Sequence, residues 1–161
     1  MTTKIKLARI EDAQAITKML VQLATEIGDS HKFMSNTDAI RRYGFGKNRI
    51  FQCFIAESHE EHQGIAVFFP EFSTTRGKPG VYIQDLWVSE NARGQGLGGR
   101  LLAEVAKHAA SEWQAAYLKL TVYEDNSAAA EFYRRLGFQA GEGDRPMSVN
   151  ETAFQQLKDQ V

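Results

Sequence analysis

The spacing of apolar residues predicts an amphipathic helix near the start of the chain. From Glu11 onward these residues recur every three or four positions, at Ala13, Ile16, Leu20, Leu23 and Ile27. That rhythm is typical of a helix with one face packed on a core. Gly28 can end this helix. Asn36 or Thr37 can cap a second, shorter helix that ends near Arg42.

Short apolar runs predict four strands in the first half of the chain. They cover residues 5–8, 50–57, 64–72 and 81–88. Polar or glycine-containing turns separate the last three runs, and this spacing favours hairpins. We therefore expect the N-terminal strands to pair mostly antiparallel.

The pattern changes in the second half, where strands alternate with helices. A helix is predicted over residues 97–111, a strand over 117–122, and a helix over 127–136 that Gly137 ends. This succession implies a parallel pair of strands joined by a crossover. A last strand over 145–149 and a closing helix over 151–159 follow. We expect one mixed α/β domain over residues 1–161.

Composition excludes several classes of function. The 161 residues include 19 Lys and Arg against 20 Asp and Glu, a net charge of −1 that argues against nucleic acid or an anionic membrane as partner. No apolar run approaches the roughly 20 residues that span a bilayer. Cys53 is the only cysteine, which excludes an intrachain disulfide and a thiolate metal cluster. We expect a cytoplasmic protein without a metal.

A glycine-rich turn from Arg93 to Arg100 carries the strongest chemical signal. It lies between the predicted strand over 81–88 and the helix that follows. Glycines let the backbone approach an anion closely, and a helix start supplies unpaired N–H groups and a positive dipole end. The turn therefore predicts a binding site for phosphate or pyrophosphate.

Two common phosphate motifs fit this turn poorly. Gly94, Gly96 and Gly99 satisfy the dinucleotide pattern G-x-G-x-x-G, but the acidic residue expected about 20 positions later would fall near Gln114. The remaining chain also provides too few strand–helix units for such a sheet. A P-loop is excluded because no Lys-Ser or Lys-Thr follows the glycines.

Two segments together resemble the GNAT superfamily of N-acetyltransferases. Its coenzyme loop reads Gln/Arg-x-x-Gly-x-Gly/Ala, and here residues 93–98 read Arg-Gly-Gln-Gly-Leu-Gly. Its later signature Asn-x(6)-Tyr-x-x-x-Gly-Phe resembles residues 126–138. The resemblance implies helices on both faces of a sheet whose fourth and fifth strands splay apart. The pantetheine arm of acetyl-CoA would pair with the fourth strand as an added strand does.

Within that superfamily the chain is most similar to the diamine (spermidine/spermine) N-acetyltransferases. The resemblance implies main-chain contacts to pantetheine from Leu86 and Val88, a further coenzyme contact from Asn126, and Tyr133 near the sulfur. It also implies a homodimer. The pyrophosphate would be surrounded by Arg93, Gly94, Gln95, Gly96, Leu97 and Gly98.

Acetyl transfer to an amine requires a proton acceptor, an oxyanion donor and a proton donor. Tyr133 is our general acid, because a phenol of pKa about 10 can protonate a thiolate. The N–H of Leu86 or Trp87 can stabilise the oxyanion, and the Trp87 ring can line an amine pocket. The diamine enzymes carry Glu-Asp where this chain has Gln84-Asp85.

The sequence does not decide which residue accepts the proton of the amine. Gln84 cannot take a proton and lacks the charge that attracts a cationic amine. Asp85 is no simple substitute, because adjacent strand residues face opposite ways. Glu26 and Glu124 are further candidates, acting directly or through water.

The sequence therefore predicts an acetyl-CoA-dependent N-acetyltransferase that acts directly on a primary amine of a polyamine, a diamine or an amino-acid-like molecule. Two alternatives remain: a coenzyme-binding regulatory module that has lost catalysis, and an enzyme that acetylates a protein or peptide amine.

Overall fold

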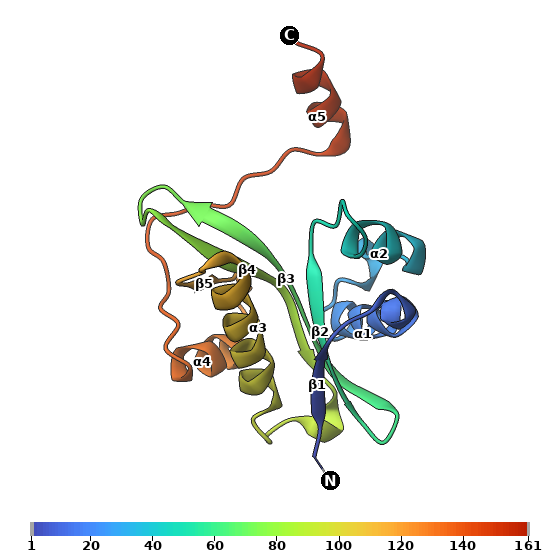
Figure 1. Ribbon diagram of the computed structural model, residues 1–161. Helices are drawn as coiled ribbons and strands as arrows, with labels where there is room; N and C mark the ends of the chain where they lie inside the picture. The colour runs from blue at the N-terminus through green and yellow to red at the C-terminus, as the bar shows by residue number, and fades with distance from the viewer. Residues whose placement is uncertain (1, 161) are drawn as a thin grey trace. The chain divides into compact units, whose positions relative to one another are not determined.

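A five-stranded sheet, in the order β1-β2-β3-β4-β5, organises the first part of the chain (Figure 1). The computed structural model describes residues 2–160, which group into two compact units, Met1–Thr121 and Val122–Val161. The sheet belongs to the first unit. Its strands are β1 (Lys4–Leu7), β2 (Gln52–Ser58), β3 (Glu61–Ser73), β4 (Lys78–Val88) and β5 (Leu118–Lys119).

The strand pairings confirm the predicted mixed sheet. β1 to β4 pair antiparallel with their neighbours, and β4 pairs parallel with β5. The parallel register covers Val81 with Leu118 and Tyr82 with Lys119. β4 continues for six residues beyond this register, so β4 and β5 diverge after a short contact.

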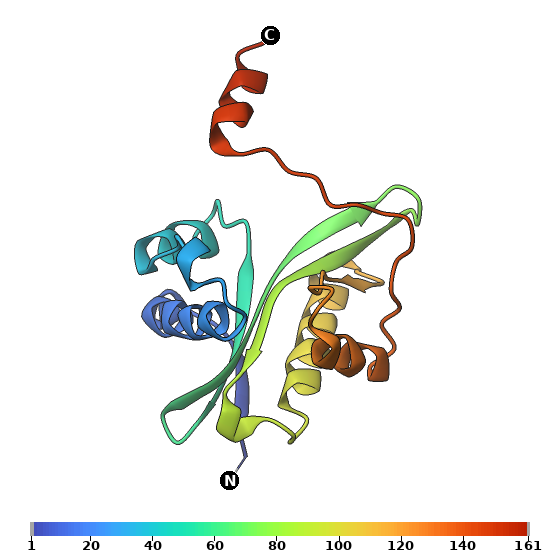
Figure 2. The ribbon, with the colours of Figure 1, turned by 180° about the vertical axis from the view of Figure 1, so that it is seen from behind.

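Helices lie on both faces of the sheet in the first unit. On one side are α1 (Ala13–Glu26) and α2 (Thr37–Gly44), and on the other is α3 (Leu97–Trp113) (Figures 1 and 2). Asn36 caps α2 by accepting from the Ala39 N–H at 2.8 Å. Three short 3-10 helices, Ile10–Asp12, Ser30–Lys32 and Glu90–Ala92, connect these elements.

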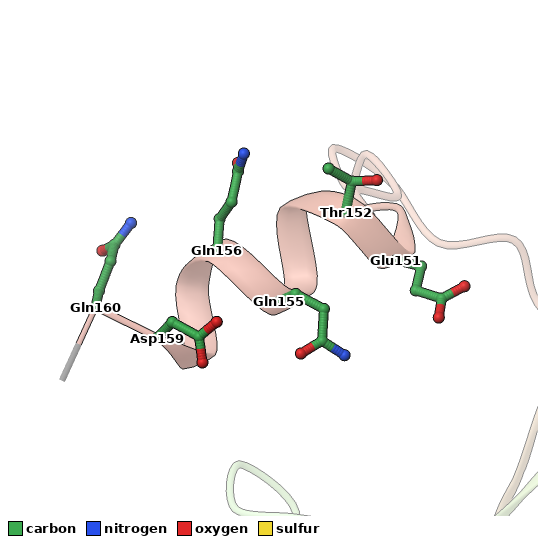
Figure 3. A pocket seen from close by; sticks show the side chains of 6 residues that line it. All are labelled: Glu151, Thr152, Gln155, Gln156, Asp159 and Gln160. Atoms are coloured by element: carbon green, nitrogen blue, oxygen red, sulfur yellow. The ribbon is translucent and has the colours of Figure 1, made fainter.

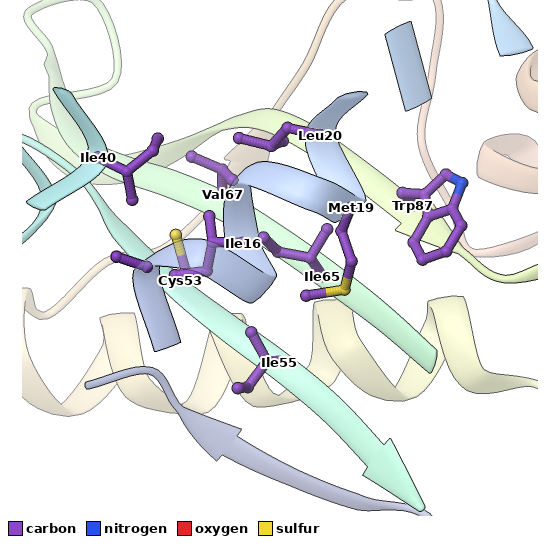
Figure 4. Close-up of a cluster of buried hydrophobic side chains, with 10 residues drawn as sticks. Ile16, Met19, Leu20, Ile40, Cys53, Ile55, Ile65, Val67 and Trp87 are labelled. Carbon is purple, nitrogen blue, oxygen red and sulfur yellow. The ribbon is translucent and has the colours of Figure 1, made fainter. Parts of the chain in front are cut away.

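Strands β2 and β3 are buried on both faces in their middle parts, which explains their continuous apolar runs. Alternate residues point to opposite helix layers. The layer beneath α1 and α2 contains Ile16, Met19, Leu20, Ile40, Cys53, Ile55, Ile65, Val67 and Trp87 (Figure 4). On the α3 side, Phe54 stacks on Phe68 with ring centroids 5.7 Å apart, and His108 of α3 meets both rings edge-on.

The second unit contains two helices, α4 (Ser127–Arg135) and α5 (Glu151–Lys158). Asparagine side chains cap both helices. Asn126 accepts from the Ala129 N–H at 3.1 Å, and Asn150 accepts from the Ala153 N–H at 2.9 Å.

Three predicted elements differ from the structure for physical reasons. The strand predicted over 145–149 is wrong: these residues have no regular secondary structure, and Pro146 provides no N–H for a ladder. The strand predicted over 117–122 shrinks to β5, because its partner pairs only at Val81 and Tyr82. The turn predicted over 58–63 tightens to His59 and Glu60, both with positive φ (51° and 67°).

Candidate active site

An irregularity in β4 decides how the acceptor side of the site is built. Asp85 pairs with Val67 of β3, but the next residue of β3, Phe68, pairs with Ile83. Gln84 is therefore the extra residue of a β-bulge, which interrupts the alternation of side chains along the strand. The expectation that Gln84 and Asp85 face opposite ways is wrong, because the bulge breaks the alternation between them and both residues line the same cavity.

This cavity has a volume of about 530 Å³ and lies between the sheet and the α1–α2 layer. Its polar lining consists of Ser35, Gln84 and Asp85. The remaining lining is apolar and comes from helices, loops and strand β3: Leu20, Phe33, Ile40, Ile50, Phe51, Val67 and Phe69. A pocket of this size with few polar groups is typical of a small-molecule site.

Asp85 is the ionisable group of the cavity wall. Partial burial raises the pKa of Asp85 from 3.8 to about 6, because desolvation penalises the charged carboxylate. Cys53 belongs to the hydrophobic layer next to this strand, and burial raises the pKa of its thiol well above the usual range. Cys53 is therefore a packing residue, while Asp85 can change protonation state near neutral pH.

The bulge changes which alternate residues of β4 direct their main-chain N–H and C=O groups toward β3. Before it, the Val81 N–H donates to Tyr117 O at 3.0 Å, on the β5 side. After it, the Ser89 N–H donates to Gln63 O on the β3 side at 2.8 Å. Alternation back from Ser89 directs the main-chain groups of Leu86 and Val88 away from β3, and those of Trp87 toward β3. Leu86 and Val88 therefore present main-chain groups along the edge where β4 has left β5.

The glycine-rich turn follows this edge and begins α3. Gly94 and Gly96 both have φ of +74°, a left-handed conformation that strains other residues. A Cβ at either position would meet no atom within 4 Å. The turn is exposed around Gln95, and Gly96 is the N-cap residue of the 17-residue α3, whose first turn contains Leu97 and Gly98. Open space over glycines beside a helix N-terminus fits a pyrophosphate.

The two arginines of this turn have different partners. Arg93 donates from Nε to Val88 O at 2.9 Å and from Nη2 to Glu26 Oε2 at 2.5 Å. Glu26 also accepts from Trp87 Nε1 at 3.2 Å. Arg100 donates to Thr3 O at 2.8 Å and so holds the start of β1. Arg93 is thus bonded to β4 and to the end of α1, whereas Arg100 joins the start of α3 to the start of β1.

The same contacts place two acceptor-side candidates away from the cavity wall. Glu26 ends α1 and joins Arg93 to the Trp87 indole, and Trp87 is buried in the α1-side core. Neither side chain lines the cavity that Gln84 and Asp85 share.

Tyr133 and Asn126 lie in the second unit. The Tyr133 ring contacts Phe132 and Phe138 edge-on, with centroids 5.0 Å and 5.4 Å away. The Asn126 side chain caps α4. Glu124 precedes that cap. The roles predicted for these residues stay predictions.

A hollow beside α5 does not add to the candidate site. The six side chains around it all come from this one helix and the residues just after it (Figure 3). No other element supplies an opposite wall among residues 2–160. Within that range, too, no cluster of His, Cys, Asp and Glu is suited to a metal ion, and no helix is long and apolar enough to cross a membrane.

Sequence reasoning missed the part of the cavity lining that connecting segments provide. Phe33, Ser35 and Ile50 come from connecting segments, where no helical or strand period marks the inward side. The bulge was equally hidden, because no glycine signals it. The acidic residue beside Gln84 was the available clue, but ideal strand geometry predicts the wrong direction for its side chain.

Comparison with known proteins identifies the family. The acetyltransferase (GNAT) family matches residues 18–138, which include β2 to β5, the glycine-rich turn and α4. The chain belongs to the GNAT acetyltransferase family. Enzymes of this family use acetyl-CoA as co-substrate. The chain is accordingly an N-acetyltransferase, and the matched residues include the glycine-rich turn for which the sequence predicts coenzyme binding.

Relatives of this GNAT enzyme match it over most of the chain or over about half of it. It is 33% identical over 146 residues to a thialysine N-epsilon-acetyltransferase of Mus musculus, covering 86% of this chain and 85% of the relative. It is 30% identical over 78 residues to a spermine/spermidine N(1)-acetyltransferase of Bacillus subtilis, covering 47% of this chain and 51% of the relative. An integron cassette protein from the mobile metagenome of V. cholerae shares the fold, with a TM-score of 0.80, 20% identity and 99% of each chain covered.

Proposed function

We propose that this enzyme transfers the acetyl group of acetyl-CoA directly to a primary amine of a small molecule. The observation that carries the proposal is one arrangement in the first unit. A cavity of about 530 Å³ has Asp85 in its wall, and the strand that bears Asp85 leads into the glycine-rich turn. The thialysine and spermine/spermidine specificities of the relatives support a small amine as acceptor.

The coenzyme side is formed by main-chain groups. The N–H groups at the start of α3 and the open space over Gly94 and Gly96 suit the pyrophosphate. Leu86 and Val88 suit hydrogen bonding to the pantetheine arm, although the Val88 carbonyl is already bonded to Arg93 Nε. Acetyl-CoA supplies an acetyl group activated as a thioester. The Leu86 N–H is our oxyanion donor, because the Trp87 N–H is directed toward β3.

Asp85 is our proton acceptor on the amine side. An alkylammonium group, of pKa near 10.4, enters charged and pairs with the ionised carboxylate. Asp85 first takes one proton from the ammonium group and later returns it to solvent, which leaves a neutral amine with a free electron pair. The amine nitrogen then forms a bond to the acetyl carbon, the carbon–sulfur bond breaks, and the nitrogen releases a second proton to solvent, so that the amide product keeps one N–H. A carboxyl pKa of about 6 leaves Asp85 mostly ionised at neutral pH, as this role requires.

Tyr133 is our general acid for the leaving thiolate. Its phenol donates a proton to sulfur and so prevents the thiolate from attacking the product. Phe132 and Phe138 contact its ring and restrict its orientation. The match of residues 126–138 to the GNAT signature supports this role.

The direct test is turnover with a panel of amines. Purified protein is incubated with acetyl-CoA and alkylamines, diamines, polyamines and amino-acid amines, while CoA release and acetylated product are measured. We expect turnover of at least one small amine. If acetyl-CoA raises the melting temperature but no amine is acetylated, the second candidate, a coenzyme-binding module, is favoured; the replacement of a family carboxylate by Gln84 motivates that candidate.

We also propose a homodimer in the cytoplasm. The resemblance to the diamine enzymes supports the dimer, and a single, buried cysteine supports a reducing compartment. Light scattering after gel filtration tests the dimer, for which we expect twice the 18.1 kDa of one chain.

A further inference from the structure

The acceptor cavity contains one carboxylate that can pair with a positively charged substrate group, and most of its other lining is apolar. Among the described residues that line it, Asp85 is the one that carries charge at neutral pH. Aromatic walls come from Phe33, Phe51 and Phe69. A second ammonium group inside this cavity would lose its hydration without gaining a carboxylate, which is unfavourable.

Gln84 occupies the position beside Asp85 where a second carboxylate could bind a second ammonium group. The bulge puts its side chain on the same cavity as Asp85, one residue away along β4. Its amide can hydrogen-bond to a neutral polar group or to water, but it supplies no charge. The wall therefore has one anionic position and one neutral polar position side by side.

We propose that the acceptor is a primary amine with a single positive charge on an uncharged, apolar body, and that Gln84 sets this preference over diamines. The proposal rests on the proposed function, because it concerns the amine that the same cavity would bind. Asp85 binds the ammonium group, and the apolar walls bind the alkyl or aryl body. Gln84 is a specificity residue, since it withholds the charge that a second ammonium group needs.

Hexylamine and 1,6-diaminohexane are a matched pair for the test, because they share a chain length and differ in one ammonium group. We would measure kcat/KM for both with acetyl-CoA, and for spermidine and thialysine as well. We expect hexylamine to be preferred over each of them by about tenfold or more, as expected for a site that rejects an unpaired charge. Binding of the same amines to the enzyme without acetyl-CoA, measured by calorimetry, should follow the same order.

Gln84→Glu provides the decisive variant. A second carboxylate beside Asp85 should raise kcat/KM for 1,6-diaminohexane relative to hexylamine by about tenfold. Gln14→Glu is the control: this exposed residue of α1 changes the net charge equally but does not line the cavity. We expect it to leave the ratio unchanged.

The outcomes separate the two proposals. A wild-type preference for a diamine, spermidine or thialysine would overturn the inference and leave the acetyltransferase function intact. An unchanged ratio in Gln84→Glu would overturn the role of Gln84. If no amine is acetylated, the proposed function fails, and calorimetric preference for the diamine would then overturn the inference separately.

Discussion

Arg93 and Glu26, 67 residues apart in the chain, form an ion pair between the glycine-rich turn and the end of α1. The same carboxylate accepts a hydrogen bond from Trp87, which lies on β4 two residues after Asp85. Arg93 is also held by the carbonyl of Val88. One guanidinium thus connects α1, β4 and the glycine-rich turn.

Because Glu26 neutralises Arg93, a phosphate must compete with it for the guanidinium. We expect Glu26→Gln to tighten CoA binding by about two- to fivefold, since a half-exposed ion pair contributes at most about 1 kcal/mol. Glutamine keeps an acceptor for Trp87. Calorimetric titration with CoA measures the effect, and Glu11→Gln, an exposed change of the same charge, serves as control. Weaker binding in Glu26→Gln would mean instead that Glu26 positions Arg93 for the coenzyme.

Asp85→Asn should separate catalysis from binding. With the pKa of Asp85 at about 6, kcat/KM of the native enzyme should rise with pH through that value as the carboxylate ionises. The variant cannot accept a proton, so we expect kcat/KM to fall about a hundredfold or more, and the acid limb near pH 6 to disappear. CoA affinity should be unchanged. An acid limb that persists in the variant would assign it to another group.

The same substitution should stabilise the fold at alkaline pH. The pKa of Asp85 is higher in the folded protein than its ordinary value of 3.8, so the folded state binds the proton more tightly. Its favourable contribution is complete below pH 4 and is lost as the pH rises through about 6. Ionised Asp85 therefore costs up to about 3 kcal/mol. Urea unfolding should show Asp85→Asn to be more stable than the native protein at pH 8, with a smaller difference at pH 4.

Gly96→Ala should weaken coenzyme binding more than its strain explains. Alanine at φ of +74° costs about 1–2 kcal/mol of stability, although no atom lies within 4 Å of its Cβ. That Cβ would project into the open space that we assign to pyrophosphate. Gly77→Ala is the matched control, because Gly77 also has positive φ (64°) and open surroundings, but lies in the β3–β4 turn. Equal losses of CoA affinity in the two variants would contradict the assignment.

Local sequence signals were sufficient for most of the fold. The helix predicted from Glu11 onward, with Gly28 able to end it, is α1 (Ala13–Glu26), and Asn36 caps α2 as its residue type suggested. The strand predictions that differ most from the structure are those for strands whose length depends on a pairing partner. β5 has two residues because its partner turns away, and no sequence period records where a partner ends.

The candidate site likewise has one part that local sequence predicts and one part that depends on strand pairing. The glycine-rich turn was readable, because positive φ at Gly94 and Gly96 requires a residue without a side chain. The shared cavity of Gln84 and Asp85 was not readable. One bulged residue reverses the direction of a side chain, and its position depends on the register with β3.

Tyr133→Phe tests the general acid assigned to α4. Phenylalanine keeps the ring that contacts Phe132 and Phe138, so the helix should remain folded. Without the hydroxyl, thiolate departure loses its proton donor. We expect kcat to fall about a hundredfold while the dissociation constant of CoA changes less than about twofold. Phe132→Leu, which removes a neighbouring ring but leaves the hydroxyl, is the control for packing. An unchanged kcat in Tyr133→Phe would remove the role, and a leaving thiolate protonated by water would then account for turnover.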